Sequence, residues 1–206
     1  MNAKEKAGDR RRDNAAATRA ALLAAGRQQF GVVGYEAASV AGLCAEAQVT
    51  TGALYYHFGD KKGLFAGVAE ELDRAMVALT GRAALDAIAR GAGPWEGFLA
   101  ACAAFVAAGL DRGGRRIGLI DAPAVLGAEW TAIRARHGFG AMRAHVGRLQ
   151  AAGLLVEGDP DRLSRMILGL LYAAVEATTE RAEMPETLAV LHAMLGALKA
   201  RDGRSA

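Results

Sequence analysis

Residues 39–58 read SVAGLCAEAQVTTGALYYHF, and this stretch decides the fold that the sequence predicts. It divides into two short helical segments, at about 40–45 and 50–56, joined by a tight connection. Two short helices that meet at a steep angle need small residues where they touch and apolar anchors into a supporting core. The small residues are Ala41, Cys44 and Ala47, and the anchors are Val40, Leu43, Val49 and Leu54. The pattern predicts a helix-turn-helix.

Two residues, one at the start of this stretch and one just after it, are expected to cap helices. Ser39 precedes the segment 40–45, where its hydroxyl can accept a hydrogen bond from an orphan amide of the first turn. Asp60 precedes a longer helix, expected over 60–80, whose apolar residues recur with a period of about 3.6 residues. Gly81 is the expected end of that helix. The apolar face of the helix comprises Leu64, Phe65, Val68, Leu72, Met76 and Leu79.

The rest of the chain is also predicted to be helical, so the expected fold class is all-α. Alanine and leucine are abundant, strand-like alternation is missing, and apolar residues recur at intervals of three and four. The first helix is expected over 14–30, with Leu22 and Phe30 on its buried stripe and Gly31 and Gly34 at its end. Further helices are expected at 94–110, 115–120, 129–152, 159–182 and 185–200.

The composition is that of a globular protein: 206 residues, 52% of them hydrophobic, with four prolines. No uncharged apolar run is long enough to cross a membrane, and the N-terminus lacks the apolar run of a signal sequence. Cys44 and Cys102 have no metal-ligand spacing, and two cysteines cannot form a disulfide framework. We expect free thiols, no metal or cofactor and a cytoplasmic location, and leave a redox role of either thiol open.

The positive charge is unevenly distributed. Residues 1–62 hold nine Lys and Arg against six Asp and Glu, whereas residues 63–206 hold sixteen of each. Phosphate attraction needs cations grouped on one face, so this asymmetry favours a basic nucleic-acid-binding end joined to a neutral body. The alternative is a basic disordered tail over 1–13 that accounts for much of the excess.

The second short helix of the helix-turn-helix exposes residues suited to DNA. Thr50, Thr51 and Ala53 are small enough at a helix N-terminus for close approach to the major groove, where threonine can contact a base edge. Hydroxyl, imidazole and ammonium groups that follow are suitable phosphate partners. They belong to Tyr55, Tyr56, His57 and Lys61.

With these residues, the chain resembles the DNA-binding domain of the tetracycline-repressor (TetR) family of bacterial transcriptional regulators over about residues 18–68. The matching positions are Phe30, Gly34, Tyr35, Ser39, Val40, 43–50, 52–58, Lys61, Leu64 and Phe65. Two positions depart from the family pattern. Gln48 stands where the turn usually has glycine and must bear any left-handed backbone strain, and Cys44 replaces the usual alanine.

The resemblance implies a homodimer in which a head at 14–60 reads half of a palindromic operator, while 61–206 holds a ligand pocket and the dimer surface. A small-molecule effector would release the operator by favouring wrongly spaced heads, with helix 60–80 transmitting the shift. Instead of contacting DNA, Tyr55 could occupy a core position between the helices. The implied DNA contacts are Thr18, Ser39, Thr50, Thr51, Ala53, Tyr55, Tyr56, His57 and Lys61.

The body offers candidates for an apolar cavity and for a flat interface. Aromatic and apolar residues at helical spacing can line a cavity, although such stripes are also typical of plain core. The cavity candidates are Trp95, Phe98, Cys102, Phe105, Trp130, Phe139, Met142 and Tyr172. Flat helix faces can form a four-helix bundle between two subunits, with intramolecular packing as the alternative. The interface candidates are Met166, Gly169, Leu170, Ala173, Ala177, Leu188, Leu191, His192 and Leu195.

Three other functions compete with a ligand-released repressor: a ligand-independent DNA-binding protein, a transcriptional activator and a helical enzyme. The enzyme would need Glu129, His137 and His145 as acid-base or metal groups. These residues are eight apart in turn, which matches no known metal-ligand pattern, and no phosphate loop or nucleophile elbow occurs. The sequence therefore favours a protein without enzyme activity, whose partners are double-stranded DNA, a second copy of itself and an unidentified small molecule.

Overall fold

The computed structural model describes residues 3–200, with side chains from Arg12 onward. The expected all-α class is confirmed, because these residues form helices joined by short turns and no strand. The nearest approach to a sheet within them is one isolated bridge between Leu155 and Lys199. None of the described helices is long and apolar enough to span a membrane.

Close contacts divide the chain into two compact units. Unit 1 comprises Met1–Leu72 and Arg112–Thr131, and unit 2 comprises Asp73–Asp111 and Ala132–Ala206. The sequence alone predicts a head that ends at residue 60. In the structure a segment from the middle of the chain also packs on the first helix, an association between distant residues that local sequence patterns do not predict.

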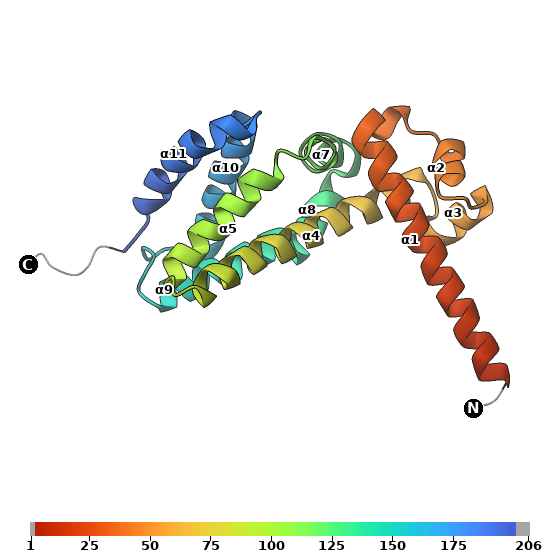
Figure 1. Ribbon diagram of the computed structural model, residues 1–206, viewed down its shortest axis with the longest axis horizontal. Coiled ribbons are helices and arrows are strands. Elements are labelled where there is room, and N and C mark those ends of the chain that lie inside the picture. Colours follow the sequence, from red (N-terminus) through yellow and green to blue (C-terminus); the bar gives the residue numbers. More distant parts are fainter. Residues whose placement is uncertain (1–2, 201–206) are drawn as a thin grey trace, which may run out of the picture. The chain divides into compact units, whose positions relative to one another are not determined.

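Unit 1 is built on helix α1, against which α2 and α3 pack (Figure 1). The segment 112–121 also packs on α1 and contains a single π-helical turn, η1, against which α7 packs. The N-terminal part of α4 and the start of α8 complete the unit. The elements are α1 (Ala3–Ala37), α2 (Val40–Glu46), α3 (Thr51–Phe58), α4 (Lys61–Ala89), α6 (Arg112–Arg115), η1 (Arg116–Asp121), α7 (Ala122–Leu126) and α8 (Ala128–Arg136).

Helix α1 is longer than the sequence predicted. It begins at Ala3 instead of Asn14, so the predicted tail is helical from residue 3, while residues 1–2 lie outside the described part. It also continues past Gly31 as far as Gly34, whose φ of 86° and ψ of 169° interrupt the helix. Glycine adopts this left-handed φ at little cost, and the kink therefore lies at Gly34. Of the two predicted helix ends, Gly34 interrupts the helix and Gly31 does not.

The core of unit 1 joins α1 to the following helices. Leu22 and Phe30 on the predicted stripe of α1 are fully buried, as is Phe65 of α4. The rings of Phe30 and Phe65 meet edge to face with centroids 5.0 Å apart. Leu43 and Leu54, two of the predicted anchors of the helix-turn-helix, are also fully buried and fix α2 and α3 on this core.

Helix α4 starts as predicted and ends later. The Oδ1 atom of Asp60 accepts a hydrogen bond from the Gly63 amide at 2.7 Å, which confirms the expected N-cap. Gly81 does not end the helix, which runs on to Ala89 and is terminated at Gly91 with a φ of 93°. A helical glycine costs only about 1 kcal/mol relative to alanine, and the alanine-rich turns around Gly81 tolerate that cost.

Unit 2 is a bundle of helices with one apolar core, in which α10 packs on α5, α9 and α11 (Figure 1). The helix predicted over 129–152 is broken at His137 (φ −117°, ψ −90°) into α8 and α9. The break is stabilised by Asp73, whose Oδ2 accepts a hydrogen bond from the Gly138 amide at 2.9 Å. The remaining elements are α5 (Pro94–Ala108), α9 (Gly138–Ala151), α10 (Pro160–Ala177), η2 (Arg181–Glu183) and α11 (Met184–Gly196).

Candidate nucleic-acid surface and ligand cavity

The turn between α2 and α3 has the backbone strain that the sequence predicted. Gln48 has a φ of 54° and is the one non-glycine residue with a positive φ among residues 3–200. Its amide donates to the Ala45 carbonyl at 3.2 Å, and the Val49 amide donates to the Cys44 carbonyl at 3.0 Å. These two hydrogen bonds close the turn and fix the direction in which α3 leaves it.

Both helices of the pair are capped by hydroxyl groups. The Ser39 Oγ accepts from the Gly42 amide at 3.0 Å, and the Thr50 Oγ1 accepts from the Ala53 amide at 3.3 Å. The predicted cap at Ser39 is confirmed. Each hydroxyl keeps its own proton, so both side chains remain able to donate to a group outside the protein.

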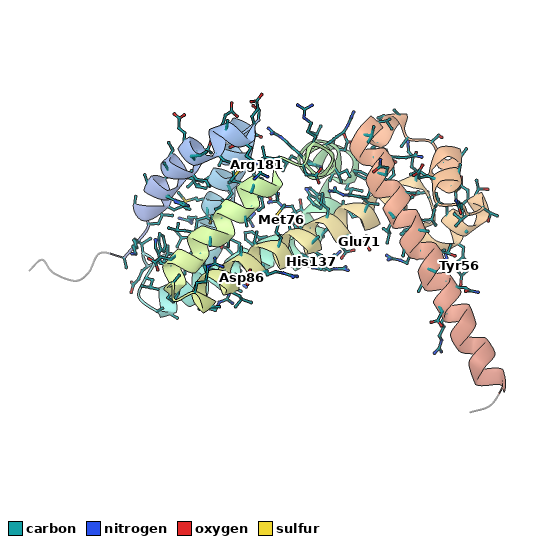
Figure 2. The ribbon with its side chains drawn as sticks, viewed as in Figure 1. Tyr56, Glu71, Met76, Asp86, His137 and Arg181 are labelled. Carbon is teal, nitrogen blue, oxygen red and sulfur yellow. The ribbon has the colours of Figure 1, made fainter. Side chains whose placement is uncertain are left out.

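The outer face of α3 carries three exposed side chains. Thr51 lies in its first turn, and Tyr55 and Tyr56 are 54% and 82% exposed. Tyr55 therefore does not occupy the core position that was its alternative. Figure 2 shows Tyr56 at this surface, with the half-buried His57 ring meeting it edge-on at 5.0 Å between centroids. Leu54 alone of α3 is fully buried, so one residue anchors the helix while its polar face stays open.

Lys61 has a structural role that the sequence did not predict. Its ammonium donates to the carbonyl oxygens of Tyr35, Glu36 and Ala38 at 2.9, 3.4 and 3.1 Å, and lies 4.3 Å from the centre of the Tyr35 ring. An ammonium has three donors, and here all three are engaged. The geometry makes Lys61 a cap for the end of α1, and its contact with a phosphate stays a prediction.

Thr18 is also placed differently from the prediction. The resemblance implies a DNA contact for Thr18 near the start of the first helix, which was expected to begin at residue 14. Because α1 begins at Ala3, Thr18 lies in the interior of the helix with its side chain half-buried. The amides around an interior residue are already hydrogen-bonded, so only the Thr18 hydroxyl could meet a phosphate.

A polar cluster that sequence reasoning missed joins η1 to the kinked end of α1. The Arg116 Nη1 donates to the Val32 carbonyl at 2.9 Å, and the Asp121 Oδ2 accepts from the Tyr35 amide at 3.0 Å. The two side chains also approach each other, with Nε and Oδ2 separated by 3.9 Å. The partners are over eighty residues apart in sequence, so no local signal predicts the cluster.

Unit 2 contains a cavity of about 330 Å³. This volume is at the small end of the range of about 300–1,000 Å³ typical of small-molecule sites. Its walls come from α4, α5, α9 and α10, and most of the lining is apolar, including Met76 (Figure 2), Phe105 and Leu168. The polar or ionisable lining residues are Asp73, Thr80, Cys102, His145, Arg148 and Tyr172.

Five of the eight residues predicted for the cavity line it, and three do not. Phe98, Cys102, Phe105, Met142 and Tyr172 are part of its wall. Trp95 is buried in the core of unit 2, and Phe139 packs against that core with Arg165 over its ring. Trp130 belongs to unit 1. Helical spacing identified apolar faces, but could not separate a cavity wall from ordinary core.

Three polar groups of the cavity, His145, Arg148 and Asp73, lie beside α9 at two positions along it. His145 stacks on Phe98 with ring centroids 5.3 Å apart, and its Nδ1 lies 3.2 Å from an Arg148 guanidinium nitrogen. Burial, and then the charge of Arg148, lower the pKa of His145, which favours the neutral ring at neutral pH. Near the first turn of α9, Asp73 is bonded to the Gly138 amide.

Tyr172 lies under the guanidinium of Arg134, which is 4.7 Å from its ring centre and hydrogen-bonded to its side chain. Burial raises the pKa of Tyr172, against the opposing charge of Arg134, so its hydroxyl is protonated at neutral pH. Both cysteine thiols are buried, and burial raises the pKa of Cys102 to about 12. Thiols of this kind are poorly reactive, because the thiolate is the reactive form.

The predicted interface residues divide between the surface and the core. On α10, Gly169, Ala173 and Ala177 are exposed, and Met166 is 58% exposed. On α11, Leu191 and Leu195 are buried in the core of unit 2, so their expected role in an interface is wrong. The half-buried remainder are Leu170, Leu188 and His192. The exposed apolar residues of α11 are instead Val190 and Met194.

The arrangement of unit 1, with a strained turn, two capped helices and an open second helix, is that of a helix-turn-helix DNA-binding head. Among the described side chains, from Arg12 to Ala200, no group of His, Cys, Asp and Glu is arranged to hold a metal ion. Residues 22–68 match the family described as bacterial regulatory proteins, tetR family, and residues 95–198 match the tetracyclin repressor-like C-terminal domain.

Solved structures of several bacterial regulators share the fold. A TetR-family transcriptional regulator from Pectobacterium atrosepticum is 35% identical, with a TM-score of 0.73, 92% of this chain and 98% of that chain covered. A putative TetR-family regulator from Shewanella sp. PV-4 is 18% identical, with a TM-score of 0.71, and the coverages are 90% and 99%. RolR in complex with resorcinol is 21% identical, with a TM-score of 0.63 and coverages of 89% and 90%.

A comparison with curated proteins found no match. The family matches and the Pectobacterium relative are sufficient: the chain belongs to the TetR family of bacterial transcriptional regulators. Members of this family are generally DNA-binding proteins without enzyme activity, and they carry a C-terminal ligand-binding domain.

Proposed function

We propose that this regulator is a homodimer that represses transcription by binding a palindromic operator, and that a small molecule bound in the cavity of unit 2 releases it. Such a repressor acts in the cytoplasm, where bacterial DNA lies. The observation that carries the proposal is the open polar face of α3, which is anchored by Leu54 and otherwise free to enter a groove.

The groups on α3 suggest a division between base and phosphate contacts. Thr51 is exposed in the first turn, where its hydroxyl and methyl groups suit a base edge, and the small Ala53 allows close approach. The hydroxyls of Ser39, Thr50, Tyr55 and Tyr56 and the imidazole of His57 suit phosphate oxygens. The first amides of α3 precede its internal hydrogen bonds and can also meet a phosphate.

The exposed apolar face of α10 and α11 supports a homodimer. Met166, Val190 and Met194 are large apolar residues that remain about half or more exposed in the single chain. The small residues Gly169 and Ala173 let a partner helix approach closely.

Helix α4 offers a covalent route for coupling the two functions. Its residues Leu64 and Phe65 are part of the core of unit 1, and Asp73, Met76 and others line the cavity of unit 2. An effector that prefers one position of α4 weakens operator binding by the difference in its affinity for the two conformations. RolR, a regulator of the same fold, has been crystallised with resorcinol, which supports a small ligand.

The DNA-binding part can be tested by selecting bound duplexes from a randomised pool. Replacing Thr51 with alanine should change the selected sequence, because a base contact costs about 1–3 kcal/mol when lost. Replacing Tyr56 with phenylalanine should weaken all duplexes alike and leave the selected sequence unchanged. Thr131→Ala, at an exposed site of α8, is the control. If both variants select and bind as the wild type does, α3 is not the reading helix.

The dimer can be tested by sedimentation velocity. The wild type should sediment as a dimer, and Met194→Glu should sediment as a folded monomer, because a buried unpaired charge is costly. Ala152→Glu, in the exposed turn after α9, should remain dimeric. A monomeric wild type would contradict the proposal. Transcription in vitro from a template carrying the selected operator then separates repression from activation.

A further inference from the structure

We infer that the effector is a small monocarboxylate with a compact apolar body, whose carboxylate binds Arg148 and His145 at one end of the unit 2 cavity. The inference rests on the proposed function of that cavity as the effector site, and it specifies the chemistry of the ligand. Three features of the lining support it: the volume, the hydrogen-bonding capacity of the polar groups, and their positions along α9.

The volume and the apolar wall define the body of the ligand. A cavity of about 330 Å³ accommodates a compact molecule, and its wall is formed by side chains such as Met76, Phe98, Phe105, Met142 and Leu168. These side chains offer dispersion contacts and no strong hydrogen bonds. A ring or a short branched chain suits this surface, whereas a sugar or a nucleotide would leave many polar groups without partners.

The polar groups beside Phe98 can only donate hydrogen bonds. A guanidinium has no acceptor, so the Nδ1 of His145 accepts from Arg148, and the proton of the neutral ring is on Nε2. Arg148 has no carboxylate within ion-pair distance among the described residues. Its charge and the imidazole N–H are therefore available to an anion, and stacking on Phe98 fixes the ring.

The strong acceptors of the cavity lie on α4. Asp73 accepts from the Gly138 amide, and the Thr80 hydroxyl donates its proton to the Met76 and Val77 carbonyls, so its oxygen can still accept. Gly138 and His145 are seven residues apart on α9, which is a rise of about 10 Å at 1.5 Å per residue. Asp73 thus stands at the opposite end of α9 from Arg148, and an anionic group on the ligand is favoured at the Arg148 end.

Tyr172 provides one further donor on the lining. Its oxygen accepts from Arg134, and its protonated hydroxyl can donate to a second oxygen of the ligand. The described polar lining is therefore richer in free donors than in free acceptors. A carboxylate, which only accepts, matches this surplus, and a cation or a neutral amine does not.

The test compares carboxylates with neutral amides of the same skeleton by calorimetric titration of the full chain. The probes are benzoate, phenylacetate and cinnamate, and benzamide, phenylacetamide and cinnamamide. At least one carboxylate should bind, and its amide should bind about 10- to 100-fold more weakly. Binding by the amides alone, equal binding by both series, or binding by neither overturns the inference.

Variants of α9 locate the carboxylate. Arg148→Gln should weaken the binding carboxylate about 10- to 100-fold while leaving the amide unchanged, and Arg148→Lys should restore part of the loss. Arg143→Gln is the matched control, because Arg143 lies on the same helix, pairs with Asp161 and is not part of the cavity lining. Unchanged carboxylate affinity in Arg148→Gln would overturn the assignment.

A DNA-binding assay separates this inference from the proposed function. A carboxylate that binds with the expected dependence on Arg148 but does not release the selected operator supports the ligand class and contradicts effector release. A neutral compound that binds in the cavity and releases the operator has the reverse meaning: it supports effector release and overturns the ligand class.

Discussion

Unit 1 and unit 2 differ in what their packed cores leave open. In unit 1, side chains bond to the backbone at points where the chain is irregular: Lys61 and Asp121 at the end of α1, and Thr50 at the start of α3. In unit 2, side chains also bond to the backbone, as Asp73 does at the start of α9 and Gln150 beyond its end, but the apolar core in addition borders a cavity. Polar contacts thus define the direction of the helices in the DNA-binding head, whereas the ligand domain combines such contacts with a space that a ligand can fill.

This difference matters for regulation. Hydrogen bonds form only within a small range of distances and angles, so they define the position of α3 sharply. A helix that contacts base edges in a groove requires such a position. A cavity leaves its lining without contacts on one side, so filling it gains dispersion energy and can shift the surrounding helices. The two tryptophans report on the two units separately, because Trp130 lies in unit 1 and Trp95 in unit 2.

The largest expected effect concerns the core of unit 2. Replacing the fully buried Leu195 with alanine should lower the free energy of unfolding by about 3 kcal/mol, because it removes apolar contacts and leaves a void. Urea unfolding followed through Trp95 in a Trp130→Phe background measures the change. The neighbouring Met194→Ala, half-exposed in one chain, should cost less than 1 kcal/mol in a monomeric background. Equal losses would show that α11 is oriented differently.

The next effect concerns the kink of α1. In Gly34→Ala the new Cβ would lie 2.7 Å from an Arg116 guanidinium nitrogen, in a backbone conformation with a φ of 86°. The left-handed conformation costs about 1–2 kcal/mol and displacing Arg116 adds to it, so we expect a loss of about 2 kcal/mol. Unfolding followed through Trp130 measures it. Gly147→Ala, helical and with no atom near its Cβ, should be neutral or stabilising.

A smaller loss is expected at Lys61. Lys61→Met keeps the aliphatic stem and removes the hydrogen bonds to three carbonyls, which should destabilise unit 1 by about 1–2 kcal/mol. Lys62→Met, at the exposed next position, should have little effect on stability. The salt dependence of DNA binding provides a second measurement. If Lys61→Met reduces the slope of log affinity against log salt concentration by about 1, Lys61 also contacts a phosphate, as the sequence predicted.

The last effect is absent at neutral pH and develops only in alkaline solution, at Cys102. The folded pKa of about 12 exceeds the ordinary value of 9.0, so above pH 9 the folded state binds more protons than the unfolded state. Stability contributed by the thiol is therefore complete below pH 9 and is lost as pH rises towards 12, by up to about 1.4 kcal/mol per pH unit. The difference in pH dependence between wild type and Cys102→Ala measures it. Parallel curves would contradict the burial of the thiol.

The local features of unit 1 were predictable because their causes are local. Ser39 and Asp60 cap helices through atoms three residues away, and Gln48 bears its positive φ because the turn demands it. Features that depend on distant residues were not predicted. Lys61 bonds to residues more than twenty positions earlier, and its role as a helix cap cannot be read from the sequence around it.

In unit 2, apolar periodicity identified the helices, but it did not show whether each apolar face packs in the core, lines the cavity or remains exposed. Helix α11 is apolar on more than one side, so its sequence allowed either Leu191 and Leu195 or Val190 and Met194 to face outward. The same ambiguity placed Trp95 and Trp130 in the cavity, although one is in the core and the other in unit 1. The donors His145 and Arg148 were visible only as a basic face until the fold placed them beside the cavity.

The sequence by itself determined the all-α class, the helix-turn-helix, its caps and its family, because each depends on residues within a few positions of one another. The tertiary structure alone decided that Arg116 and Asp121 hold the end of α1, which faces of α10 and α11 are open, and which polar groups reach the cavity. These contacts join segments that are far apart in the chain, and they form only when the helices have packed, so local sequence patterns do not predict them.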